Sequence, residues 1–155
     1  MMSIRQMMQD DFEEILEMMK IFYASPAVLH KTPEEVLRRD IEDCIGDMPF
    51  IEGFVFTNDM EICGYAMAAK GYSTEYGGLC VWIEDLYIKP EYRHQGLSTQ
   101  FFTFLEKLYK NQAVRFRLEV AEDNKSAVDA YLKNGYRLLP YLEMTKETVS
   151  CEKKF

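Results

Sequence analysis

Three β-rich runs follow one another between residues 50 and 88, and this segment limits most strongly what the chain can fold into. The first two runs flank the short turn "TNDME" in "FIEGFVFTNDMEICGYAMAAKGY", a pattern typical of an antiparallel hairpin. A looser turn, "STEYGG", leads to the third run, "LCVWIEDLYI". The segment therefore predicts three consecutive strands that form a meander.

A short strand and two amphipathic helices are predicted before the meander. The strand lies around Ile4, and the apolar face of the first helix repeats at i, i+3, i+4, i+7 and i+11 through Phe12, Ile15, Leu16, Met19 and Tyr23. The start of the second helix is indicated by "TPEE", with Thr32 as N-cap, Pro33 in the first turn and Glu35 closing a capping box. Gly46 predicts its end.

After the meander the pattern alternates between helix and strand. We expect a helix over about 97 to 110, a strand "VRFRLEV", a helix over about 124 to 134 closed by Gly135, and a Pro-interrupted strand pair in "YRLLPYLEMTK". The order β-α-α-β-β-β-α-β-α-β-β predicts an α+β fold with a mixed, largely antiparallel sheet flanked by helices. We expect one domain over residues 1–155, because no linker or repeat interrupts it.

Composition excludes several classes of function. Eighteen Lys and Arg against 26 Asp and Glu give a net charge of −8, which disfavours nucleic-acid binding. The acidic start "MMSIRQMMQDDFEEILEMM" predicts neither a signal peptide nor a membrane span. We predict reduced structural thiols, no metal site and a cytoplasmic protein, because no C-x-x-C pair occurs among Cys44, Cys63, Cys80 and Cys151.

The stretch "YIKPEYRHQGLSTQFFTFLEKLY" joins a strand to a helix through a glycine-containing loop. The N-terminus of a helix exposes backbone N–H groups and a positive dipole end, which together favour a bound phosphate. Gly96 allows close backbone approach, Ser98 adds a hydroxyl donor, and Arg93 with His94 adds positive character. Such a loop often only starts a helix, and it is neither a P-loop nor a dinucleotide fingerprint. It predicts a phosphate or pyrophosphate site.

Two motifs together resemble the GCN5-related N-acetyltransferase (GNAT) superfamily. "WIEDLYIKPEYRHQGLS" is similar to its signature strand and acetyl-CoA pyrophosphate loop, and "LEVAEDNKSAVDAYLKNGYR" resembles its following strand and helix. The motifs cover residues 81 to 138 in matching order and spacing. The resemblance implies the GNAT acyl-CoA N-acyltransferase fold, acetyl-CoA as cosubstrate and transfer of an acetyl group to an amine.

The resemblance also implies the residues that contact the coenzyme. The backbone of Leu86, Tyr87 and Ile88 would pair with the pantetheine arm like an added strand. The pyrophosphate would be held by the loop residues Arg93, His94, Gln95, Gly96, Leu97, Ser98 and Thr99. Asn124 would both cap its helix and donate to the coenzyme. The family usually has Gly or Ala at the position of Ser98, and Gly or Arg at that of His94.

Catalytic roles fall on Tyr131 and Glu84. Tyr131 matches a tyrosine that the family places near the coenzyme sulfur, where a phenol suits a general acid, although it also fits an apolar helical stripe as a core aromatic. Glu84 is the candidate base that helps to deprotonate the amine, and Asp85 orients the substrate or anchors the strand. Strand alternation sends these two carboxylates to opposite faces unless a bulge intervenes, and both would otherwise lie on a solvated face.

The acceptor is predicted to be a small cationic amine. Tyr72, Glu75 and Tyr76 place aromatic rings beside a carboxylate, which suits an ammonium group, although they also fit an ordinary hairpin turn. The alternatives are a peptide or protein N-terminus as acceptor, a non-catalytic CoA-binding regulatory module, and a plain interaction domain. A homodimer through the C-terminal "YLEM" is a further possibility implied by the family.

Overall fold

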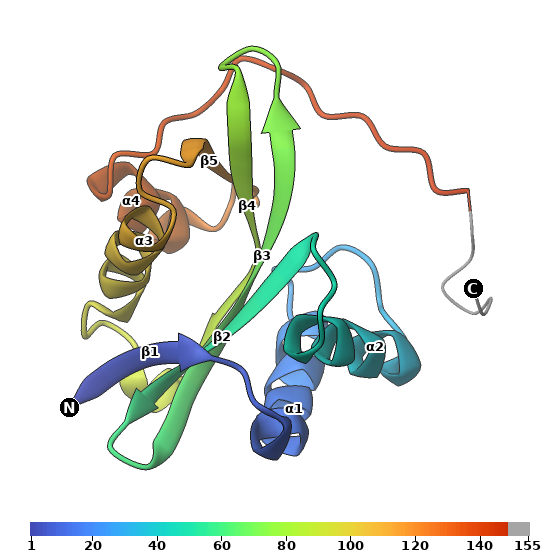
Figure 1. Cartoon of the computed structure of the whole chain (residues 1–155), viewed down its shortest axis with the longest axis vertical. Helices are drawn as coiled ribbons and strands as arrows, with labels where there is room; N and C mark the ends of the chain where they lie inside the picture. Colours follow the sequence, from blue (N-terminus) through green and yellow to red (C-terminus); the bar gives the residue numbers. More distant parts are fainter. Residues whose placement is uncertain (149–155) are drawn as a thin grey trace.

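A five-stranded mixed sheet forms the centre of the computed structural model, which describes residues 1–148 (Figure 1). Its strands are β1 (Met2–Gln6), β2 (Ile51–Asn58), β3 (Glu61–Ser73), β4 (Gly78–Ile88) and β5 (Ala113–Leu118). They lie in sequence order, with β1 to β4 antiparallel and β5 parallel to β4. The predicted meander and the mixed, largely antiparallel sheet are therefore confirmed.

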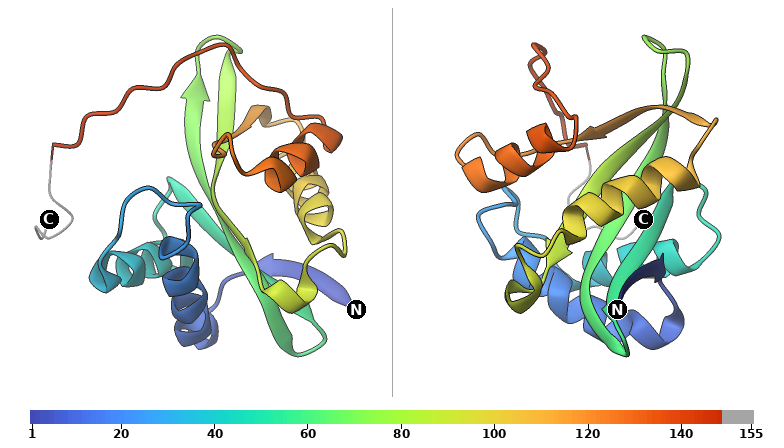
Figure 2. Two further views of the ribbon diagram at one scale, coloured as in Figure 1. Left: turned by 180° about the vertical axis from the view of Figure 1, so that it is seen from behind. Right: turned by 90° about the vertical axis from the view of Figure 1, so that its left-hand side faces the viewer.

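Helices cover both faces of this sheet. They are α1 (Phe12–Tyr23), α2 (Glu34–Ile45), α3 (Leu97–Leu108) and α4 (Lys125–Lys133), with short 3₁₀ turns η1 (Gln9–Asp11) and η2 (Pro90–Tyr92). In Figures 1 and 2, α1 and α2 lie on one face and α3 and α4 on the other. None of the helices within residues 1–148 combines the length and apolar character needed to cross a membrane.

Strand alternation divides the interior into two cores. On β2, Phe54 and Phe56 pack toward Phe101 of α3, whereas Val55 joins the core beneath α1 and α2 with Ile15. The central strands are buried on both faces, and for this reason their sequences are nearly continuous runs of apolar residues. This double burial fixes the register of β4, the strand that carries the candidate catalytic carboxylates.

Two predictions of local structure were wrong. Thr32 does not cap α2: its hydroxyl donates to the carbonyl of His30, Pro33 occupies the N-cap position, and no side chain caps this helix within the described chain. The Pro-interrupted strand pair is not formed either, since residues 137–148 contain no strand and run past the β3–β4 turn as extended coil (Figure 1). Pro140 lacks an N–H donor, and pairing depends on a distant partner strand that the local pattern cannot specify.

The glycine at position 64 tests how tightly β3 and β4 are packed. A Cβ at Gly64 would overlap the carbonyl oxygen of Tyr87 and lie 2.9 Å from the ring of Phe56, so Gly64→Ala should lower the free energy of unfolding by about 2 kcal/mol or more. Gly71→Ala, on the same strand with nothing within 4 Å, is the control and should change it by about 0.5 kcal/mol at most. Urea unfolding of both variants makes the measurement, and equal stabilities would contradict the packing described.

Candidate functional site

A β-bulge in β4 separates the environments of Glu84 and Asp85. The register pairs Met67 with Asp85 and Ala68 with Ile83, so Glu84 is an extra residue with no partner on β3. The Glu84 side chain is exposed, whereas that of Asp85 is only 3% exposed. The β-bulge, which the sequence analysis gave as an alternative to regular strand alternation, is therefore present. It directs the two carboxylates to different surroundings.

The sheet opens between β4 and β5 at this same point. β5 pairs with β4 only from Leu79 to Ile83, so residues 84–88 of β4 have β3 on one side and no strand of the described chain on the other. Backbone groups of Leu86, Tyr87 and Ile88 therefore lie along an open edge. Such an edge can accept an extended, amide-containing ligand in the manner of an added strand.

The open edge leads through η2 to the N-terminus of α3. Gly96 is the N-cap with φ 80°, and in the part of the chain that the structure describes no side chain caps this end. The first helical bond runs from the Gln100 N–H to the Gly96 carbonyl, which leaves the N–H groups of residues 97–99 available to an anion. A left-handed φ favours glycine at this position.

The side chains of the loop over residues 93–97 make different contacts around the N-terminus of α3. Arg93 donates from Nε to the Ile88 carbonyl at 2.8 Å and lies over the Tyr87 ring, 5.7 Å from its centroid. Gln95 donates to the Glu91 carbonyl, and His94 is exposed with φ 61°. Leu97 is buried in the core, so only its backbone faces the loop. The loop thus offers mainly backbone donors, with Arg93 fixed between the edge and the helix.

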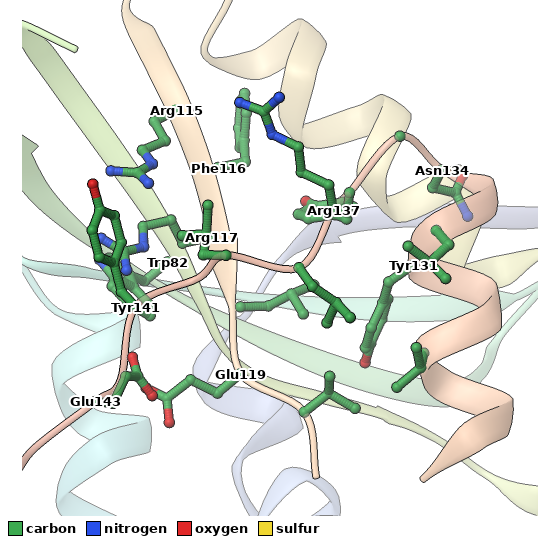
Figure 3. A pocket seen from close by; sticks show the side chains of 18 of the residues that line it. Trp82, Arg115, Phe116, Arg117, Glu119, Tyr131, Asn134, Arg137, Tyr141 and Glu143 are labelled. Atoms are coloured by element: carbon green, nitrogen blue, oxygen red, sulfur yellow. The ribbon is translucent and has the colours of Figure 1, made fainter. Parts of the chain in front are cut away.

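Tyr131 packs against the core and also lines a cavity. Its ring packs edge-to-face on Phe102 at 5.8 Å, and burial raises the pKa of its phenol. Figure 3 shows the hydroxyl directed from α4 into a cavity of about 750 Å³ beside β5. A raised pKa keeps the phenol protonated, as a proton donor requires.

Asn124 caps α4 as predicted. Its Oδ1 accepts from the Ala127 N–H at 3.4 Å, which leaves the amide nitrogen available to a ligand. The predicted closure of this helix by Gly135 is also present, with φ 88°.

Asp85 lies beneath α1 in a neutral hydrogen-bonding environment. Its carboxylate accepts from the Tyr65 hydroxyl at 2.8 Å and from the Tyr23 hydroxyl at 2.9 Å. Burial raises the pKa of Asp85, and the two hydroxyl donors lower it. These contacts tie β4 to α1 and β3, which fits the anchoring alternative, while the sequence gave no sign of Tyr23 and Tyr65 as its partners.

Glu84 faces further carboxylates that sequence reasoning missed. Although the side chain is accessible to solvent, the surrounding protein partly desolvates it, and this raises its pKa first, followed by the charges of Asp85, Glu119 and Glu143. Glu119 and Glu143 line the cavity (Figure 3). The pKa of Glu119 is raised first by burial and second by the charge of Glu143. The alternation of "RFRLE" could have indicated Glu119, because Phe116 and Leu118 pack in the core and leave the intervening side chains to the opposite face. Glu143 carried no comparable signal.

The three residues of the β3–β4 turn that are predicted to contact the amine lie in different surroundings. Tyr76 lines the cavity, and Glu75 pairs with Arg115 at 3.1 Å and accepts from the Tyr141 hydroxyl at 2.8 Å. Tyr72 is 72% exposed and does not line the cavity. Within residues 1–148 no group of three His, Cys, Asp or Glu side chains is arranged to hold a metal ion.

Comparison with known proteins connects this geometry to one family. A model of the Acetyltransferase (GNAT) family matches residues 5–136. Thialysine N-epsilon-acetyltransferase of Sus scrofa is 31% identical over 151 residues, covering 90% of this chain and 86% of that protein. The Mus musculus protein of the same name is 30% identical over 139 residues, covering 83% and 79%.

Solved structures share the fold at lower identity. A possible acetyltransferase from Clostridium difficile 630 matches with a TM-score of 0.80 at 19% identity, covering 96% of this chain and 99% of that one. An aminoglycoside N-acetyltransferase in complex with CoA matches with a TM-score of 0.80 at 16% identity, covering 96% of each chain. At these identities the likeness is evidence of the fold.

The pKa of the Asp40 carboxyl, on α2, measures the electrostatic effect of Asp85 on its surroundings. Burial first and the Asp85 charge second raise the pKa of Asp40 to about 6. We expect the NMR titration of Asp40 to have its midpoint near that pH. Asp85→Asn should lower the pKa of Asp40, while burial keeps this pKa above the ordinary value of an aspartate. Since the unfolded chain binds this proton less tightly, raising the pH from about 4 to about 6 should destabilise the fold through Asp40.

Asp11 is the internal control for this titration. Hydrogen bonds from Arg5 hold the pKa of Asp11 below its ordinary value, so Asp85→Asn should leave it in place. An unchanged Asp40 titration in that variant would show that the two carboxylates are not coupled.

Proposed function

Because the chain belongs to the acetyltransferase (GNAT) family, we propose that it transfers the acetyl group of acetyl-CoA to the primary amine of a small cationic molecule. Glu84 serves as the base and Tyr131 as the acid. One observation carries the proposal: the unpaired edge of β4 runs from the N-terminus of α3 to the bulge at Glu84, beside the cavity that Tyr131 lines. Acetyl-CoA supplies the activated acetyl thioester.

The residues present fit the coenzyme along this path. The free N–H groups at the start of α3 suit its pyrophosphate, and Gly96 allows close approach there. The open edge at Leu86 to Ile88 suits the amides of the pantetheine arm. The Asn124 amide nitrogen and the Arg93 guanidinium supply further donors.

The proposed reaction is a direct attack. An amine with an ordinary pKa of about 10.4 is almost fully protonated at neutral pH, so it must first lose a proton, which Glu84 accepts directly or through water. The amine nitrogen then forms the new N–C bond, and the C–S bond breaks. Tyr131 donates its proton to the leaving sulfur, so that the thiol departs neutral. The second proton, which the nitrogen loses as the amide forms, restores the Tyr131 hydroxyl.

The charge around the site supports a cationic acceptor. The charges of Glu119 and Glu143 raise the pKa of Glu84, and that of Glu143 raises the pKa of Glu119, so a bound ammonium would relieve this repulsion. The relatives are named for thialysine, and one matching solved structure for aminoglycosides, both amine acceptors. Glu75 and Tyr76 are part of the proposed acceptor side, and Asp85 orients the strand that carries Glu84.

Location and assembly complete the proposal. Unpaired Cys44, Cys63 and Cys80 support a reducing, cytoplasmic setting, which cell fractionation tests, while Cys151 lies outside the described residues. Leu138, Leu142 and Met144 are exposed on the extended C-terminal segment, which supports a homodimer through this segment. A single-chain mass by light scattering would exclude the dimer.

An acetyl-CoA turnover assay tests the proposed function. Free thiol release and product mass are followed with small amines, aminoglycosides and short peptides as acceptors. Acetylation of a small amine supports the proposal, and a product from peptides alone would favour a peptide or protein N-terminal acetyltransferase. CoA binding without any product would favour a non-catalytic CoA-binding module.

Replacing Tyr131 by Phe removes the proposed proton donor but keeps the ring packed on Phe102. We expect kcat to fall about a hundredfold or more, with the KM for acetyl-CoA little changed. Tyr136→Phe is the matched control, since Tyr136 packs on the same Phe102 ring, and it should keep kcat. Wild-type turnover in Tyr131→Phe would remove this residue from the mechanism.

Replacing Glu84 by Gln tests the base through pH. The carboxylate must be ionised to accept a proton, so the wild-type rate should fall as the pH drops through the raised pKa of Glu84. In Glu84→Gln that dependence should vanish, and the optimum should shift upward toward the pKa of the amine itself. A pH profile identical to that of the wild type would argue that another group or water is the base.

A further inference from the structure

The cavity beside β5 is larger than an acetyl group requires. Its volume is about 750 Å³, which is in the range of sites that enclose a whole small-molecule ligand. Glu119 and Glu143 lie together on one side of it, and Figure 3 shows the guanidiniums of Arg115 and Arg137 displaced from this pair. The cavity therefore has an acidic side and a basic side.

Arg117 is the arginine of β5 whose N–H donors are not in use. Its guanidinium carbon lies 4.2 Å from the centroid of the Trp82 ring, and within residues 1–148 no carboxylate lies within ion-pair distance of it. Arg115, by contrast, is bound to Glu75 at 3.1 Å. Stacking on a ring uses the flat face of a guanidinium and leaves its edge of N–H donors available. Arg117 is thus ready to bind an anion that the described chain does not provide.

The two proposed reactants differ in whether they can bring this anion. A small cationic acceptor is attracted by Glu119 and Glu143 and repelled by Arg117. The pyrophosphate of the coenzyme has its own proposed site, at the free N–H groups of residues 97–99, and its third phosphate is at the far end of the coenzyme from the thioester. The part of either reactant that is left to meet Arg117 is the acyl group of the donor.

The register of β4 and β5 places Arg117 at a suitable distance from the reacting carbon. Arg117 pairs with Trp82, two residues before Glu84, which corresponds to roughly 7 Å along the strand. A four-carbon acyl chain has three C–C bonds and spans roughly 4 Å between its thioester carbon and a terminal carboxylate. The long side chain of Arg117 can cover the rest. An acetyl group ends at its methyl carbon and has no group for Arg117 to bind.

We propose that the protein uses a second donor, a dicarboxylic acyl-CoA such as succinyl-CoA, and that Arg117 binds the free carboxylate of its acyl group. This inference rests on the proposed function and extends it to a further acyl transfer. The amine nitrogen forms a bond to the thioester carbon, the C–S bond breaks, and CoA leaves as the thiol, so the product is an N-acyl amine with a free carboxylate. Guanidinium and carboxylate groups pair through two parallel hydrogen bonds, which the methyl end of an acetyl group cannot make.

Two thioether analogues test the binding of this acyl group without turnover. S-carboxypropyl-CoA has a four-carbon chain that ends in a carboxylate, and S-butyl-CoA has a methyl group in its place. Calorimetry should show the carboxylate analogue binding about tenfold or more tightly, the effect of a charge-assisted bidentate pair. Arg117→Met should abolish this difference by weakening the binding of the carboxylate analogue alone. Arg117→Lys, which keeps the charge but loses the planar fork, should retain part of it.

Turnover with the small amine that accepts the acetyl group tests the activity itself. The kcat/KM for succinyl-CoA should exceed that for butyryl-CoA, which has the same chain length without the carboxylate, about tenfold or more. Arg117→Met should remove this excess, while turnover of acetyl-CoA stays unchanged. The mass of the product identifies the acyl group that is transferred.

The outcomes separate this inference from the proposed function. Thermal unfolding checks that both variants fold, and if Arg117→Met does not fold, the wild-type comparison and Arg117→Lys decide. If no donor acylates any amine, the proposed function fails, while the binding ratio still decides whether Arg117 receives the acyl carboxylate. If acetyl transfer occurs, the absence of succinyl transfer overturns this inference alone. Equal binding of the two analogues, or equal losses for both in Arg117→Met, would also overturn it.

Discussion

The loss of pairing between β4 and β5 beyond Ile83 is the constraint on which the rest of the site depends. β4 pairs with β3 on both sides of the bulge at Glu84, whereas its pairing with β5 ends at Ile83, the residue before the bulge. One strand edge is thereby left open inside a folded domain. α3 and α4 pack on the same face of the sheet, so the N-terminus of α3 and the helix that carries Tyr131 lie on one side of it (Figure 2).

Burial on both sides of the sheet provides the stability that allows a small domain to leave this strand edge unpaired. Apolar side chains of β2, β3 and β4 contribute to two cores, one beneath α1 and α2 and one beneath α3. Asp85 is held within this frame by two tyrosine hydroxyls and has no cationic partner in the described chain. The interior therefore holds one carboxyl group next to the bulge that is stabilised by hydroxyl donors rather than by a cation.

Local patterns predicted the elements well and their long-range partners poorly. The hairpins, Asn124 as a cap and Gly135 as a terminator depend on a few neighbouring residues, and all are present. The strand pair around Pro140 failed because a strand needs an edge elsewhere in the fold. Thr32 failed as a cap because its hydroxyl bonds to His30 instead. Glu143 and Arg137 could not be assigned to the site, since their position depends on the path of an irregular segment.

The sequence by itself determined the order of elements as far as α4, the glycine-containing loop that starts α3, and the family, because these follow from periodicity, turn chemistry and two contiguous motifs. Only the tertiary structure decided how Glu84 and Asp85 part at the bulge, and which charges meet across the cavity. Arg117 and Glu119 are two positions apart in the sequence, whereas Trp82, Glu143 and Tyr131, which line the same cavity, come from three other parts of the chain. Distances between such groups are set by packing of the whole domain, which no local pattern encodes.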